Sequence, residues 1–198
     1  MPRRMNYLLL FLLLAAASMA AQELVFQLDT AQSHVDFTLG DVLHTVHGKF
    51  QLKNGVLHFD RSTGNATGEL ILDANSGDSD SNARDKKMKR DVLETNKYPT
   101  IVFTPQKVTG MLAPNGGSQM QMQGIMSLHG QQHAMTLVVP VVVNGSSASA
   151  DVHFVVPYVE WGLKDPSTLF LRVSKTVDID VHAVGTLTTQ AAAVSPTH

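Results

Sequence analysis

The chain is dominated by an alternation of apolar and polar positions with a period of two residues. Between residues 119 and 129, Met120, Met122, Met126 and Leu128 fall on one face of an extended chain, and glutamine and serine side chains fall on the other. This alternation is typical of antiparallel strands that are buried on one face only. Similar alternation, or a short apolar run, predicts further strands at 24–28, 35–39, 42–52, 56–60, 68–75, 133–143, 148–159 and 169–184.

Turn signals separate these segments at the spacing of hairpins. Asn54-Gly55 predicts a tight hairpin after the strand at 42–52, and residues 129–132 predict a turn before the strand at 133–143. No part of the chain alternates strands with helices, as parallel sheets require. The pattern therefore predicts an all-β fold of about eight to ten strands, either a closed or nearly closed barrel or a sandwich.

One segment breaks the strand pattern. Residues 82–91, "NARDKKMKRD", carry seven charges in ten residues, although the whole chain is only 16% charged. Capping residues precede the segment and Pro99 follows it, so we expect one helix at about 82–94, near the mouth of the barrel. Helical spacing places Arg84 in one row with Met88 and Val92, and it leaves a solvated face of Lys86, Lys87, Lys89 and Arg90. An arginine on a packed face needs an anionic partner. An internal carboxylate and a ligand head group both remain open, and the carboxylate is favoured.

The first 20 residues have the form of a secretory signal peptide. A basic start is followed by the apolar run "LLLFLLLAAA" and by small residues before a cleavage site near Ala20. We therefore expect a periplasmic or secreted protein, and the loss of Arg3 and Arg4 takes the formal net charge from −2 to −4. That charge argues against general nucleic-acid binding. The chain contains no cysteine, so core packing must stabilise it. One domain is expected at 21–185, followed by a disordered tail at 186–198.

Catalytic and metal-binding patterns are weak. His44 and His47 would point to opposite faces of a strand, so together they cannot chelate one ion, and no Cys ligand exists. No nucleophile elbow and no glycine-rich strand-to-helix loop occurs, so neither catalysis nor a nucleotide cofactor is predicted. The sequence indicates a non-enzyme without cofactor or metal. His44 and His129 are the residues through which an alternative barrel enzyme would act.

The interior of the barrel is the favoured site, because eight strands leave room for side chains or for one small ligand. Methionine side chains are flexible and suit an irregular apolar ligand, although ordinary core packing would also explain them. His44 lies in an otherwise apolar row, where a hydrogen-bonded core histidine is the favoured interpretation and a polar contact inside a ligand cavity is the alternative. The predicted ligand contacts are Val42, His44, Val46, Phe50, Met120, Met122, Met126 and Phe154, with Arg84 as the candidate for a head group.

Three stretches resemble signatures of the YceI-like family, whose members are exported bacterial proteins that bind lipids or polyisoprenoids in an extended lipocalin-like barrel. The similarity covers roughly residues 24–182, and two substitutions depart from the family pattern. Gln32 replaces a usual His, and Val92-Leu93 replaces a pair of Phe, so the identity of the ligand stays open. The matching positions are Asp29, Ser33, Val35, Phe37, Val46, Gly48 and Phe50, then Ser76, Arg84, Asp85, Met88, Tyr98, Pro99, Ile101 and Phe103, and finally Gly124, Leu128, His129 and Gly130.

The resemblance implies a single antiparallel eight-stranded β-barrel of the extended lipocalin-like type, with one short helical insert. It implies noncovalent carriage of a long-chain amphiphilic lipid, of polyisoprenoid or fatty-acid type, with no nucleic-acid partner and no stable membrane insertion. A homodimer stays open. Three alternatives remain: an outer-membrane β-barrel, against which an aromatic content of 6% argues, a barrel enzyme with a histidine-based site, and an interaction protein whose basic helix docks an acidic partner.

Overall fold

The computed structural model describes residues 22–40, 44–168 and 172–191. The expected signal peptide lies outside these ranges, as does Val42. Within them, the strands are β1 Gln22–Leu28, β2 His34–Gly40, β3 Thr45–Phe50, β4 Leu52–Asp60, β5 Ala66–Asp73, β6 Thr100–Thr109, β7 Gly116–Leu128, β8 Gln131–Asn144, β9 Ser147–Val156 and β10 Val177–Ala191. The helical elements are the 3₁₀ turn η1 Ala74–Ser76, α1 Asn82–Lys87 and the π-helical turn η2 Met88–Val92.

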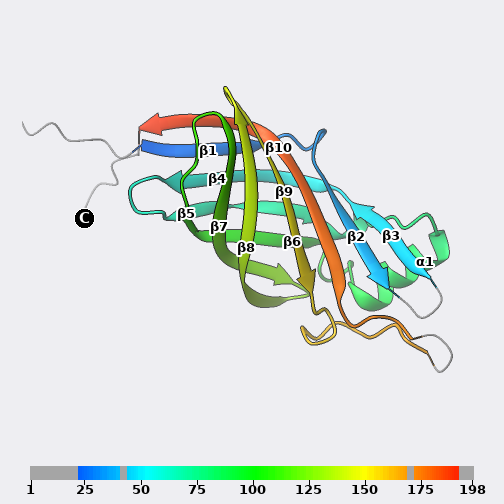
Figure 1. The fold of residues 1–198 in the computed structure, drawn as a ribbon. Coiled ribbons are helices and arrows are strands. Elements are labelled where there is room, and N and C mark those ends of the chain that lie inside the picture. The colour runs from blue at the N-terminus through cyan, green and yellow to red at the C-terminus, as the bar shows by residue number, and fades with distance from the viewer. Residues whose placement is uncertain (1–21, 41–43, 169–171, 192–198) are drawn as a thin grey trace, which may run out of the picture.

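The ten strands form one antiparallel sheet that closes on itself. Its order is β1-β4-β5-β6-β7-β8-β9-β10-β2-β3, and a further pairing of β1 with β10 closes a ring of eight strands (Figure 1). β10 pairs with β1 over residues 185–191 and with β2 over residues 178–182, so β2 and β3 extend the wall beyond the end of β1. The prediction of an eight-stranded barrel with one short helical insert is confirmed.

The turn predicted at Asn54-Gly55 is wrong, because both residues lie within β4 beside a β-bulge. The chain runs from β3 through Gln51 into β4 without reversing. Packing explains this glycine: a Cβ at Gly55 would lie 2.4 Å from a methyl group of Leu70 and 2.9 Å from Cβ of Leu28. The signal therefore reports a close approach of neighbouring strands rather than a turn.

The limits predicted for the last strand also need correction. β10 begins at Val177 rather than near 169 and continues to Ala191, and its residues 186–191 pair with β1. These residues were expected to belong to a disordered tail. They are mostly polar, with Leu187 as the one described side chain among them that lines the cavity, and their pairing follows from backbone hydrogen bonds to β1 that no side-chain pattern predicts.

The helical insert forms where it was expected. α1 and η2 lie at one end of the barrel, whereas the described chain begins and ends at the other (Figure 1). Asp85, not Arg84, is the buried residue of α1, so the placement of Arg84 on the packed face is wrong. Met88 and Val92 do pack against the core. None of the helices in the described ranges combines the length and the hydropathy needed to cross a bilayer.

Candidate ligand-binding cavity

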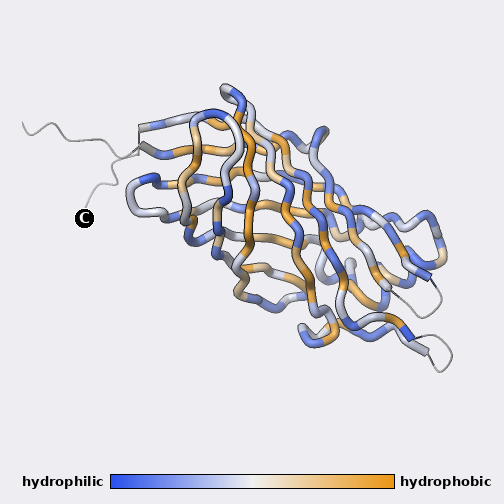
Figure 2. Tube along the Cα trace, viewed as in Figure 1, coloured by the Kyte–Doolittle hydropathy of each residue, from blue (hydrophilic) through white to orange (hydrophobic). Residues whose placement is uncertain are grey.

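The barrel encloses one large cavity with a volume of about 980 Å³. That volume lies at the upper end of the range found for small-molecule sites, roughly 300–1,000 Å³. Hydrophobic and hydrophilic positions alternate along the strands that surround it (Figure 2). The alternation turns every second side chain inward, and the inward side chains make a predominantly apolar wall.

Seven of the nine predicted ligand contacts lie on this wall: Val46, Phe50, Met120, Met122, Met126, Phe154 and Arg84. His44 is exposed and precedes β3, and it is not one of the described residues that line the cavity. The strand begins only at Thr45, so the row on which the prediction for His44 rested does not extend to it. Val42 falls outside the described residues.

The methionines of β7 lie in cross-strand pairs with residues of the two neighbouring strands, β6 and β8. Met122 lies opposite Leu137, and Met126 lies opposite Phe103. Gly124, between them on the same face, makes room for the Phe103 ring, since a Cβ at this position would lie 2.5 Å from Cζ. The methionine side chains can change rotamer at low cost, so this part of the wall can adapt to an apolar chain.

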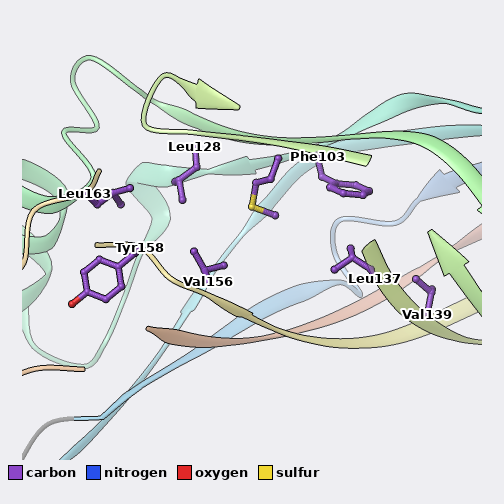
Figure 3. Packing of buried hydrophobic residues seen from close by; sticks show 8 residues of the cluster. Phe103, Leu128, Leu137, Val139, Val156, Tyr158 and Leu163 are labelled. Carbon is purple, nitrogen blue, oxygen red and sulfur yellow. The ribbon is translucent and has the colours of Figure 1, made fainter. Parts of the chain in front are cut away.

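Side chains from opposite walls approach one another near the helical end. Phe103 and Leu128 point toward Leu137 and Val156 from the facing strands (Figure 3). Tyr158, from the segment after β9, is buried beside them, and its hydroxyl donates to the carbonyl of Ser174 at 2.6 Å. Burial, with a contribution from Asp165, raises the pKa of Tyr158 to about 12. The segment after β9 thus covers this end of the cavity.

Polar groups border the cavity at both ends. Arg84 and Lys87 line it at the helical end, although Lys87 was assigned from the sequence to the solvated face. Asp60 and Arg61 line it at the other end, near the apolar loop residue Met111. Hydrogen bonds from Ser62 and Thr63 lower the pKa of Asp60 to about 2. An apolar interior with charged rims is suited to an amphiphilic molecule.

Arg84 is held by a serine rather than by a carboxylate. Its Nε donates to the hydroxyl of Ser79 at 2.7 Å, and a terminal nitrogen donates to the carbonyl of the same residue. The Ser79 hydroxyl in turn donates to the carboxylate of Asp85 at 2.5 Å, and the Ser79 amide donates to it at 3.1 Å. None of the ion pairs among the described residues involves Arg84. The favoured expectation, a direct internal ion pair of Arg84, thus finds no carboxylate partner among the described residues.

The wall is interrupted between β8 and β9. In the described chain these strands pair only over Val141–Asn144 and Ser147–Ala150, and Figure 1 shows them diverging from there. Trp161, from the segment after β9, stacks on His133 of β8 with ring centres 3.9 Å apart. This contact spans the two sides of the interruption. Sequence reasoning missed it, because residues 157–159 were assigned to the strand predicted at 148–159, which ends at Val156, and residues 160–163 carry no periodic pattern.

His129, the second histidine considered for catalysis, takes part in a structural contact. It forms a 2.8 Å hydrogen bond with Glu94, and its ring packs on Tyr98 with centres 4.6 Å apart. It is not one of the described residues on the cavity wall. The contact fixes the turn after β7 to the end of the helical insert.

Comparison with known proteins gives a consistent result for the fold. The sequence profile of the YceI-like domain matches residues 26–185. The crystal structure of Burkholderia cenocepacia BcnA is similar with a TM-score of 0.64 at 21% identity, covering 79% of this chain and 98% of that one. A polyisoprenoid binding domain from Saccharophagus degradans, implicated in plant cell wall breakdown, is similar with a TM-score of 0.61 at 16% identity. The match covers 81% of this chain and 97% of that one. The Campylobacter jejuni YceI protein is similar with a TM-score of 0.54 at 13% identity, and the match covers 67% of this chain and 79% of that one. No curated protein matches the chain.

Proposed function

The chain belongs to the YceI-like family, and from this premise we propose that it binds and carries a long-chain amphiphilic lipid without a covalent bond. The observation that carries the proposal is the apolar cavity of about 980 Å³ inside the barrel. A polyisoprenoid or a fatty-acid type of chain fits such a wall, because both expose a long hydrocarbon surface. The similar Saccharophagus degradans domain, described as polyisoprenoid binding, supports this class of ligand.

Burial of the hydrocarbon chain provides the affinity. Each methylene that leaves water contributes about 0.8 kcal/mol, which corresponds to a roughly fourfold gain in affinity. The flexible methionines of β7 adjust to the chain, and Phe50 and Phe154 provide large apolar surfaces on other strands. The seven predicted contacts on the wall are proposed to touch this ligand.

The cationic rim sets the orientation of the ligand. Arg84 and Lys87 border the cavity at the helical end, so an anionic or strongly polar head group is proposed to lie there with the chain extending inward. The fork of an arginine matches carboxylate and phosphate oxygens. In this proposal the protein performs no chemistry on the lipid and works outside the cytoplasm, after removal of the signal peptide.

Native mass spectrometry of the mature chain, purified without detergent, tests the proposal. We expect a mass increase that matches one bound lipid, which disappears after extraction with organic solvent. The extracted protein is then titrated with prenyl and acyl chains of increasing length. Affinity should rise about fourfold per methylene until the chain fills the cavity. Protein without any lipid after purification, together with no binding of added chains, would contradict the proposal.

A further inference from the structure

The outer surface of the barrel carries a regular array of histidines and aspartates, separate from the cavity. It consists of two rows of cross-strand neighbours on β2, β10 and β9, and we call it the His–Asp grid. One row is His34, His182 and Asp151, and the other is Asp36, Asp180 and His153.

The grid faces solvent because alternate residues of the same strands face inward. Val35, Val181 and Val152 line the cavity, so their neighbours in the sequence point to the opposite side of the sheet. The side chains of His34 and Asp36 are about half exposed, at 51% and 52%. All six residues of the grid, together with Val152 and Val181, border a surface hollow of about 340 Å³. A small solute can therefore reach these side chains without entering the barrel.

Two histidines lie side by side in one row of the grid, His34 on β2 and His182 on β10. The ring centres of His34 and His182 are 5.2 Å apart. In a tetrahedral zinc site with Zn–N bonds of about 2.0–2.1 Å, two imidazole rings stand at roughly this separation. One carboxylate lies two residues from each histidine on its own strand, Asp36 after His34 and Asp180 before His182, and the two aspartates lie opposite each other. Two imidazoles and two carboxylates thus surround one area of the sheet.

The outer members of the grid orient the inner ones. His182 forms a 2.6 Å hydrogen bond from Nδ1 to Asp151, which leaves Nε2 as the nitrogen that could bind a metal ion. A carboxylate behind the histidine is the arrangement that metal-binding imidazoles usually have, because it fixes the tautomer and strengthens the donor. Asp180 is held in the same way by Nδ1 of His153 at 2.8 Å.

We propose that His34, His182, Asp36 and Asp180 bind a divalent transition-metal ion of the zinc type on the outer wall of the barrel. The two nitrogen and two oxygen donors suit a borderline ion such as Zn²⁺ or Co²⁺, and the two carboxylates neutralise its charge. A surface that served only for histidine–aspartate hydrogen bonds would not need a second histidine beside the first. The contact between His34 and His182 therefore favours a metal ion over a solvated polar surface.

Binding requires small side-chain rotations. Among the described residues no three such side chains already converge as a metal site, because each histidine of the grid now contacts an aspartate. The side chains are exposed, so their rotation displaces no packed neighbour. Lys49 lies opposite Asp36 on β3, and its charge makes Asp36 the most easily displaced of the four ligands.

The test is a titration of the untagged mature chain with Zn²⁺ by calorimetry and with Co²⁺ by visible absorption. We expect one ion per chain and the intense visible bands of tetrahedral Co²⁺. H34Q and H182Q should each abolish these bands. D151N, which removes only the orienting carboxylate of His182, should weaken binding about 10- to 100-fold. The matched control is H58Q, because His58 pairs with Glu23 at 3.4 Å on the outer surface without a second histidine.

Each outcome decides the proposal. Loss of binding in H34Q and H182Q, with full binding in H58Q and unchanged melting temperatures without metal, supports it. Absence of stoichiometric binding in the unmodified chain overturns it. Binding of the metal by H34Q and H182Q as tight as that of the unmodified chain overturns it as well. Lipid binding, measured on the same variants, should not change, because the grid lies outside the cavity.

Discussion

Arg84 and Ser79 are joined by two hydrogen bonds at the rim of the cavity, one from Nε to the serine hydroxyl and one from a terminal nitrogen to the serine carbonyl. The arginine is thereby held beside the cavity that it lines, and none of the ion pairs among the described residues involves it. Its remaining nitrogen-bound hydrogens can meet an anionic head group. Asp85 therefore accepts the hydrogen bonds that hold Ser79, whereas Arg84 lines the cavity and is the residue proposed to meet the head group.

R84Q should weaken the binding of chains with carboxylate or phosphate head groups by about tenfold, because it removes a charge-assisted hydrogen bond. Chains that end in an alcohol should lose much less. Stability should fall by about 1–2 kcal/mol, because two hydrogen bonds to the buried Ser79 are lost. Affinities from fluorescence competition check the prediction. R90Q is the control, because Arg90 pairs with Asp91 at 2.7 Å and is not one of the described wall residues. Equal losses for both variants would contradict the assignment.

D85N should lower the free energy of unfolding by about 1–3 kcal/mol, because the buried carboxylate accepts hydrogen bonds from the amide and hydroxyl of Ser79. Urea denaturation measures the change. D80N, at an exposed position of the same loop, should stay within about 0.5 kcal/mol of the parent protein. A D85N protein as stable as D80N would show that the hydrogen bonds to Ser79 do not stabilise this loop.

M122W should shorten the longest chain that the barrel accepts, because the larger side chain projects from β7 into the cavity. Overpacking is expected to cost about 1–3 kcal/mol of stability. Gln121 is the next residue on the same strand and is exposed, so Q121W adds the same ring outside the barrel. Titration of both variants with a series of chain lengths checks the prediction, and identical length limits would argue against binding in this cavity.

Stability should fall in alkaline solution as Tyr158 ionises. The pKa of Tyr158 is raised from 10.0 to about 12, mainly by burial, so the folded state holds this proton more tightly than the unfolded state. The stability that the protonated Tyr158 hydroxyl contributes is fully present below pH 10, and it is lost as the pH rises to about 12. Denaturation midpoints across this range measure the loss. Y158F should show a shallower decline there, and should be about 1 kcal/mol less stable at neutral pH, because the carbonyl of Ser174 loses its donor. A decline as steep in Y158F would mean that other groups cause it.

The side-chain pattern predicted the walls of the site better than its ends. Met120, Met122 and Met126 alternate with glutamines, and this period of two suffices to turn them inward. Tyr158 was assigned to the strand predicted at 148–159, which ends at Val156, and Trp161 follows it without a periodic pattern, so no local signal showed that they cover the helical end and the interruption between β8 and β9. Arg84 was placed by ideal helical spacing, but the short helix presents Asp85 to the interior instead.

By itself, the sequence determined the class of fold, the helical insert and the apolar character of the barrel interior, because alternation along a strand is a local property that survives any arrangement of strands. The tertiary structure decided which edges pair. It joined residues 186–191 to β1, turned Asn54-Gly55 from a hairpin into a packing contact, and brought His34 beside His182 across two strands far apart in the chain. Pairing between distant strands depends on backbone hydrogen bonds and on the closure of the whole ring, and neither is encoded in the pattern of a single segment.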